Sequence, residues 1–293
     1  MDLFLMSPPH PNWRLVGRAN FRSESAPEVD PAKARAEWLA LAREIERRGG
    51  TVAVLPPQLE LTGLPFAAEA GHPLPARVPG GRPRFLLPRM KPVHRTAERE
   101  KWRPFVERLG FEAIELDGGI WEGQGDVATF GRHTLLFYGG RTNREGVEAA
   151  RVHFDGEILP VEIEPVVHHG NMAVLPIPAL RRIIVCADVV LDDSLALLEA
   201  RIGRDRMHFV SSEEMRCYST NAIAFGLSLL APSILPERVH HLFERDGLDV
   251  TPLAMTELCE KGGGGTRCLV CHFPDAPDSL TIPADATIDA VCS

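Results

Sequence analysis

The chain has 293 residues and a net charge of −8, and its apolar and charged fractions are those of an ordinary globular protein. The negative charge argues against a nucleic-acid surface, which needs a basic face, but it would suit a small cationic substrate. No run of about 18 apolar residues is present, and the first residues lack the basic and apolar regions of a signal peptide. We therefore expect a cytoplasmic protein that binds neither nucleic acid nor membranes.

One pattern recurs along the chain. A charged amphipathic helix is followed by a glycine or a loop and then by a short apolar strand. The copies cover residues 30–56, 96–116, 143–163, 194–210 and 235–254. Further strand-like runs lie between them, at residues 133–139 and 181–191.

The helix boundaries can be predicted in the first two copies. Asp30 is a good N-cap, Pro31 suits the first helical position, and Gly49–Gly50 end the first helix. In the second copy Thr96 is the expected cap, and Gly110 is the expected stop.

Five such units, roughly 45 to 60 residues apart, indicate an internal repeat, and periods of this size suggest an array or a propeller. A doubly wound sheet would show a similar alternation. It would usually carry a glycine-rich phosphate loop after its first strand, and residues 55–63 do not form one. The dinucleotide-binding interpretation is therefore weak.

The glycine run at 262–265 is followed by Cys268, Cys271 and His272, which match the C-x-x-C-H pattern of haem attachment. Without an export signal that interpretation is weak, and the cysteines should be thiols. A zinc site wants four ligands at regular spacing, and a redox pair wants a helix after the first cysteine, whereas here the apolar pattern indicates a strand. We expect no metal or cofactor, and Cys268 is the candidate nucleophile.

Two further stretches carry candidate chemistry. His168 and His169 are adjacent on an apparently extended segment, so they should face opposite sides, and one should point inward as a core histidine or a base for Cys268. Glu122 and Asp126 bracket a Gly-Gln-Gly turn, which lets both carboxylates converge, although a plain loop would look the same and the spacing does not fit an EF-hand.

Together these motifs resemble a known group of enzymes. "WEGQGDV" at 121–127, "GGRTN" at 139–143, a histidine beyond them and "GGGGTRC" at 262–268 are similar to the guanidino-group modifying enzymes. These include arginine deiminase, dimethylarginine dimethylaminohydrolase and glycine amidinotransferase. The resemblance implies a five-bladed pseudo-symmetric α/β propeller, the pentein fold, with residues 1–293 as a single catalytic domain.

The resemblance also assigns roles. It implies that Cys268 is the nucleophile, that His169 is the general acid and base, and that Glu122 is the acid beside it. The residues that it places on the substrate are Glu69, Asp126, Arg141, Asn20 and Asn171. Among these, the carboxylate at 69 would hold the guanidinium, and the arginine at 141 would hold an α-carboxylate.

Two departures from the pattern of these enzymes bear on the substrate. Their His-x-Asp is His169-Gly170-Asn171 here, so an amide replaces a carboxylate that grips the guanidinium in arginine deiminases. The turn at Glu122 is one residue longer than its commonest form.

The resemblance implies a hydrolase that converts the guanidino group of arginine, or of a methylated arginine, to a ureido group through a covalent intermediate on Cys268. The expected partner is this small guanidino substrate, with a homo-oligomer as a possible assembly. Two alternatives stay open from the sequence: an amidinotransferase, in which an amine takes the place of water, and a non-catalytic binding protein of the same fold.

Overall fold

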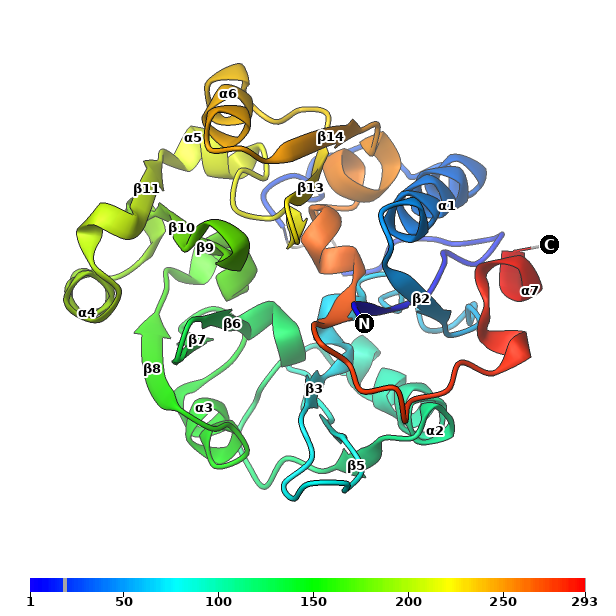
Figure 1. Ribbon diagram of the computed structural model, residues 1–293. Coiled ribbons are helices and arrows are strands. Elements are labelled where there is room, and N and C mark those ends of the chain that lie inside the picture. Colours follow the sequence, from blue (N-terminus) through cyan, green and yellow to red (C-terminus); the bar gives the residue numbers. More distant parts are fainter. Residues whose placement is uncertain (18–19, 293) are drawn as a thin grey trace.

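The computed structural model describes residues 1–17 and 20–292. Its strands form five three-stranded sheets, which are arranged in a ring around a common centre with the helices outside (Figure 1). None of the helices in these residues is long and apolar enough to cross a membrane.

Each sheet is built from the same sequence of elements. In one of them β3 (His72–Leu74) pairs antiparallel with β4 (Arg84–Leu86), and β4 pairs parallel with β5 (Glu112–Ile114). The connection between the parallel strands is helix α2 (Arg99–Leu109), because parallel neighbours need a crossover of this kind. Helix–strand units that repeat in the sequence are therefore the outer part of each blade.

Three more blades repeat this order of two antiparallel strands, a helix and a parallel third strand. The next contains β6 (Val127–Phe130), β7 (His133–Tyr138), α3 (Arg144–Arg151) and β8 (Glu157–Glu162). It is followed by β9 (Val174–Ile177), β10 (Arg182–Cys186), α4 (Asp192–Ile202) and β11 (Met207–Val210). The last contains β12 (Ile223–Phe225), β13 (Ser228–Pro232), α6 (Glu237–Arg245) and β14 (Asp249–Leu253).

The remaining blade joins the two ends of the sequence and closes the ring. Strand β1 (Leu3–Met6) pairs parallel with β2 (Thr51–Val54) across helix α1 (Pro31–Arg47), and antiparallel with β15 (Cys271–Phe273). Figure 1 shows the first and last parts of the chain side by side in this blade. Two short helices, α5 (Ser212–Arg216) and α7 (Ile288–Cys292), complete the α-helices of the described residues.

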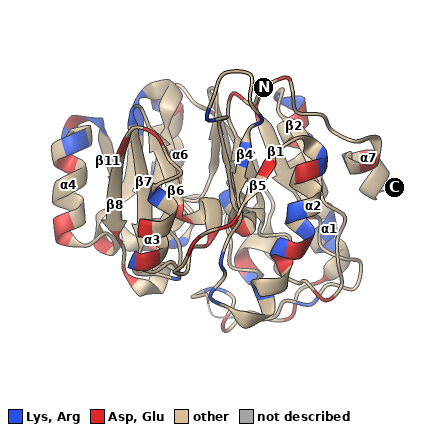
Figure 2. Ribbon diagram, turned by 90° about the horizontal axis from the view of Figure 1, so that it is seen from below, with Lys and Arg blue, Asp and Glu red and all other residues tan. Residues whose placement is uncertain are grey.

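The outer helices pack an apolar face on the sheets and expose a charged one. In α1 the buried side chains are those of Ala34, Trp38, Leu41, Ala42 and Ile45, which recur at helical spacing. Charged residues cover the outer helices in the side view (Figure 2). The core is therefore a ring of apolar side chains between sheets and helices.

All five predicted helix–strand units are confirmed, with one correction to the start of a unit and one to a strand expected between units. Asp30 caps α1 by accepting from two backbone N–H groups, as expected. Thr96 is not the cap of α2, because it lies inside the 3-10 turn Val93–Glu98 and α2 begins only at Arg99. The strand expected at 181–191 ends at Cys186, where a 3-10 turn follows.

Short turns precede the first strand of each blade, at its inner end. Four are 3-10 turns, at Ala67–Ala70, Gly123–Asp126, Gly170–Met172 and Thr266–Leu269. The corresponding segment before β12 is an irregular turn at residues 217–222. Because all five first strands surround the centre of the ring, these turns bring distant parts of the sequence together there.

Candidate active site

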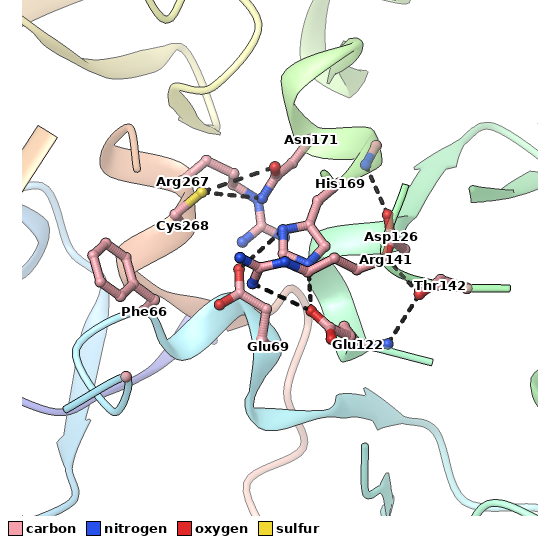
Figure 3. A network of polar contacts seen from close by, with 12 residues as sticks. Phe66, Glu69, Glu122, Asp126, Arg141, Thr142, His169, Asn171, Arg267 and Cys268 are labelled. Atoms are coloured by element: carbon pink, nitrogen blue, oxygen red, sulfur yellow. Dashed lines mark hydrogen bonds and ion pairs between the residues drawn. The ribbon is translucent and has the colours of Figure 1, made fainter. Parts of the chain in front are cut away.

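The five inner turns hold a cluster of polar side chains. Glu69, Glu122, His169, Asn221 and Cys268 come from or beside five different turns, one for each blade. Figure 3 shows four of them, Glu69, Glu122, His169 and Cys268, around a common centre. The ring therefore assembles residues that are up to two hundred positions apart in the sequence.

Cys268 lies on the turn Thr266–Leu269, immediately before β15, and is 6% exposed. Its Sγ accepts from the side-chain amides of Asn221 (3.3 Å) and Asn171 (3.5 Å). The preceding glycines permit this packing, because a Cβ at Gly264 would lie 2.9 Å from the Cβ of Cys268 and from the ring of Phe66. The glycine run thus allows the backbone to pack closely against Cys268.

The thiol of Cys268 is neutral near pH 7. Burial and the neighbouring Glu69 carboxylate raise its pKa to about 12, against the hydrogen bonds from Asn221 and Asn171 and the charge of Arg267, which lower it. A cation placed between Glu69 and Cys268 would reverse the effect of the carboxylate and favour the thiolate.

His169 lies between two carboxylates. Its Nε2 is 2.8 Å from Oε2 of Glu122, and its Nδ1 is 3.5 Å from Oε1 of Glu69. Burial alone would lower the pKa of this histidine, but the charges of Glu69, Asp126 and Glu122 outweigh it and raise the pKa. The imidazole is therefore held ready to carry a proton.

Glu122 is fully buried and is fixed from several sides. Its Oε1 accepts from the backbone N–H of Lys91 (2.8 Å), and its own N–H donates to Oγ1 of Thr142 (3.0 Å). Burial raises its pKa, but the hydrogen bond and charge of His169 and the charge of Arg141 lower it to about 2. Glu122 is therefore an ionised partner that orients His169.

The carboxylates of Glu122 and Asp126 do not converge on a substrate cavity, and that expectation is wrong, because neither residue is among the described residues that line the cavity. Oδ2 of Asp126 accepts from Oγ1 of Thr142 (2.6 Å), and its Oδ1 accepts from the N–H of Gly170 (2.8 Å). Both carboxylate oxygens thus accept from protein groups, one in the same blade and one at the start of the next. Burial raises the pKa of Asp126 to about 6.

Glu69 is buried, and its two carboxylate oxygens have different partners. Its Oε2 forms an ion pair with Arg95, and Arg95 also binds Glu98 (2.7 Å) and the carbonyl of Gly63 (2.9 Å). Its Oε1 faces His169. A guanidinium of the protein itself therefore neutralises one side of this carboxylate and leaves the other side toward the cavity.

A small cavity of about 80 Å³ opens beside these groups. Cys268, His169 and Glu69 line it, together with the predicted residues Asn20 and Arg141. The volume suits a small planar group, since a single water needs only about 10–15 Å³ on this measure. Cys268 and His169 thus line one cavity, whereas Glu122 contacts His169 and is not among the described residues that line it.

The two remaining predicted binding residues on this side are held differently. Arg141 is partly exposed, and its Nη1 lies 3.7 Å from Oε2 of Glu122. Its backbone N–H donates to the carbonyl of His168 (2.9 Å). Asn171 lies at Cys268 and is not among the described residues that line the cavity. The amide at 171 therefore contacts the thiol.

The segment around His168 and His169 is not an extended strand. His168 ends a 3-10 turn with a φ of 59°, and only His169 has extended backbone, before the next turn begins. Both histidines line the cavity, but burial and Arg141 lower the pKa of His168 to about 4, so it is a neutral ring.

The other two members of the C-x-x-C-H pattern point away from the thiol of Cys268. Cys271 is buried, with its Sγ 3.7 Å from the carbonyl of Gly71, and His272 binds Asp2 (2.8 Å). Cys268 lies on a turn, and the strand expected here begins only at Cys271.

Asn221 is the main residue that sequence reasoning missed. It donates to Cys268 Sγ and to the carbonyl of Asn171 (3.2 Å), and its Oδ1 accepts from the N–H of Cys268 (3.3 Å). The repeat itself could have revealed it, because it precedes β12 just as Asn171 precedes β9 and Cys268 precedes β15. Arg95 was also missed, since no local pattern marks a buried arginine.

The ring of five three-stranded α/β blades, with the polar cluster at its centre, is the pentein fold, as the resemblance implied. The N-terminal domain of ArgZ, described as an arginine dihydrolase of cyanobacteria, superimposes with a TM-score of 0.83 at 20% identity, over 92% of this chain and 97% of that one.

Two other solved structures show the same fold. Unliganded AgrE matches with a TM-score of 0.83 at 20% identity over 97% of this chain, which spans 41% of the AgrE chain. A dimethylarginine dimethylaminohydrolase matches with a TM-score of 0.69 at 20% identity, over 92% of this chain and 99% of that one. No protein-family model and no curated protein matches the sequence. At these identities the likeness defines the fold.

Proposed function

We propose that the protein hydrolyses the guanidino group of arginine, or of a methylated arginine, to a ureido group through a covalent intermediate on Cys268. The observation that carries this proposal is the meeting of Cys268, His169 and Glu69 in one cavity, with Glu122 fixed behind the histidine. Solved structures of the same fold include an arginine dihydrolase and a dimethylarginine dimethylaminohydrolase, which supports this substrate class. Residues 1–293 would act as a single catalytic domain.

The substrate guanidinium would lie against the free oxygen of Glu69. A planar cation with several N–H donors pairs well with a carboxylate, and Oε1 is the oxygen that Arg95 leaves open. Its positive charge would lower the raised pKa of the Cys268 thiol, so the thiol would release its proton to solvent and form the thiolate when substrate is bound. The amides of Asn171 and Asn221 would stabilise that thiolate.

The chemical steps follow from these positions. The Cys268 sulfur would form a bond to the guanidinium carbon, and a C–N bond would break as His169 gives its proton to the departing amine or ammonia. His169 would then take a proton from water, whose oxygen attacks the amidino carbon. The C–S bond would then break, releasing the thiolate, and the remaining hydroxyl proton would pass to solvent as the ureido product forms.

Glu122 would keep His169 oriented and would stabilise its protonated form. The carboxylate is ionised and lies 2.8 Å from Nε2, so the imidazole can alternate between acid and base without moving. Asp126 would act through the backbone of Gly170 beside this histidine.

Arg141 is proposed to hold the α-carboxylate of the substrate at the mouth of the cavity. Arginine would satisfy both Glu69 and Arg141, whereas agmatine, which lacks the carboxylate, would satisfy only Glu69. A charge-assisted contact is worth about 1.5–3 kcal/mol, so arginine should exceed agmatine by roughly ten- to a hundredfold in kcat/KM.

The test is to incubate the purified protein with arginine, methylated arginines and agmatine, and to follow ureido product and released amine by mass spectrometry. Arg141→Ala should remove most of the difference between arginine and agmatine. Asn12→Ala is the control, since Asn12 is exposed and is not among the described residues that line the cavity. Equal turnover of agmatine and arginine by the unmodified protein would rule out the assignment of Arg141.

A further inference from the structure

A second cavity, which we call the axial cavity, occupies the centre of the ring beyond the catalytic turns. Its volume is about 690 Å³, within the range of about 300–1,000 Å³ that small-molecule sites occupy. Its described lining residues include none of those that line the catalytic cavity.

The two cavities lie toward opposite ends of the inner strands. The catalytic residues precede strands β3, β6, β9 and β15. The axial cavity is lined mainly by these strands, by β12 and by residues that follow them, and at its inner end by Gln124, Ala222 and Arg267, which belong to the inner turns. All five blades therefore contribute to its wall. A ligand there would not compete with the guanidino substrate for space.

Arg267 gives the axial cavity its charge. It is partly buried, and its Nη1 donates to the carbonyl of Val270 (2.8 Å). Among the described residues no carboxylate forms an ion pair with it, in contrast to Arg95, which has two. Burial lowers the pKa of Arg267, and the negative charge of Glu69 offsets this only in part.

The rest of the wall indicates what such a ligand would look like. Of the described lining residues, Arg267 carries the only Lys or Arg side chain, and burial lowers the pKa of His72 to about 3, so this histidine is neutral. The apolar lining includes Phe154, Phe225 and Phe273. One fixed positive charge beside aromatic side chains suits a ligand that has one negative charge and an apolar group.

The number of negative charges on the ligand is limited by nearby carboxylates. Asp155 and Asp275 line the cavity and are exposed, and Asp2, which pairs with His272, also lines it. These groups would repel a polyanion such as a nucleotide. We propose that the axial cavity binds a small monocarboxylate with an apolar tail, with its carboxylate on Arg267 and its tail against the three phenylalanines.

The experiment uses 3-phenylpropionate as the probe, with 3-phenylpropionamide as its neutral counterpart, and measures binding to the purified chain by isothermal titration calorimetry. The carboxylate should bind and the amide should bind at least roughly tenfold more weakly, since only the carboxylate makes a charge-assisted contact. Because binding is measured directly, the result does not depend on the proposed enzymatic activity.

Two variants locate the site. Arg267→Gln removes the charge and keeps an amide donor for the Val270 carbonyl, and Thr129→Trp fills the axial cavity from an exposed position of β6 without altering Arg267. Each should weaken binding of 3-phenylpropionate by roughly ten- to a hundredfold. Should Arg267→Gln fail to fold, Thr129→Trp alone decides the location.

The control is Arg141→Ala, which removes the arginine of the catalytic cavity and should leave the affinity for 3-phenylpropionate unchanged. Binding that is lost in Arg141→Ala and kept in Thr129→Trp would place the carboxylate in the catalytic cavity and overturn the proposal. Equal affinity for the acid and the amide, or no binding of either, would overturn it as well.

Discussion

Two neighbouring histidines at the catalytic cavity differ in what surrounds their rings. His169 lies between Glu69 and Glu122, which raise its pKa against the effect of burial, whereas burial and Arg141 lower the pKa of His168 to about 4. A histidine that transfers protons near neutral pH must be able to become protonated there, which the surroundings of His169 favour and those of His168 oppose. The two residues are therefore matched variants for a test of the acid–base assignment.

His169→Ala should lower kcat by roughly 10²- to 10⁴-fold, because a positioned general acid and base contributes about that much. His168→Ala should change kcat far less, since burial and Arg141 keep this ring neutral. Both variants are compared by steady-state kinetics at equal folded fraction, checked by circular dichroism. A larger loss in His168→Ala would show that His168, and not His169, transfers the proton.

The reactivity of Cys268 toward iodoacetamide should report its raised pKa. With a pKa of about 12, the thiolate fraction rises about tenfold for each pH unit across the neutral range, so alkylation should show no plateau below about pH 10. Glu69→Gln should speed the reaction, because it removes the negative charge that raises this pKa. Peptide mass spectrometry follows Cys268 separately from the other cysteines.

A plateau near pH 7 in the protein without substrate would contradict this account, since it would require a preformed thiolate. Unchanged alkylation in Glu69→Gln would show that the carboxylate does not act on the sulfur.

At the scale of the elements, the turn before β12 contacts Cys268 through the side chain of Asn221. Asn221 contacts both the sulfur and the N–H of Cys268, and it holds the carbonyl of Asn171. It is not among the described residues that line the catalytic cavity, so we expect it to position Cys268 without touching the substrate.

Asn221→Ala should therefore lower kcat by roughly ten- to a hundredfold, which is the effect of losing a hydrogen bond to a charged sulfur, with a smaller change in KM. The same variant should slow alkylation of Cys268 at a given pH, because it loses a contact that favours the thiolate. A rise in KM at constant kcat would instead indicate that Asn221 binds the substrate.

The elements also show which features a single sequence predicts. The five helix–strand units follow from local chemistry, such as the side chain of Asp30 at the start of α1 and Gly110 at the end of α2. Thr96 was misplaced because a 3-10 turn precedes α2, and Thr96 donates to the carbonyl of Val93 within it. Nothing in the local sequence distinguishes that turn from the first turn of a helix.

The candidate site was predicted less completely, for a physical reason. Cys268, His169 and Glu122 are carried by recognisable motifs, whereas the partners of Asp126 belong to a different blade and an adjacent loop. Arg95 is marked by no motif, because its role depends on two carboxylates that fold around it. Such contacts exist only after the ring has closed.

At the scale of the whole molecule, the closure between β1 and β15 links the first residues to the turn that carries Cys268. Phe4 is fully buried, its ring stacks on His272 at 4.2 Å, and it meets Phe225 edge-on at 5.1 Å. This aromatic group joins the first, the last and the β12 segments of the ring.

Phe4→Ala should lower the free energy of unfolding by about 3–5 kcal/mol, as expected for a large buried ring that leaves a cavity. Leu227→Ala is the control, since Leu227 is 54% exposed and should change stability by less than about 0.5 kcal/mol. Urea unfolding followed by tryptophan fluorescence measures both. A loss below about 1 kcal/mol for Phe4→Ala would show that closure does not depend on this contact.

The central claim is that Cys268 carries the amidino group of a guanidino substrate during turnover. The most direct measurement is to mix the protein with arginine or a methylated arginine, quench in acid before the reaction is complete, and determine the mass of the peptide that contains Cys268. We predict an added amidino group on this cysteine, present in Cys271→Ser and absent in Cys268→Ser, together with ureido product in solution. Ureido product formed at full rate by Cys268→Ser, or an adduct on Cys271 in its place, would contradict the account.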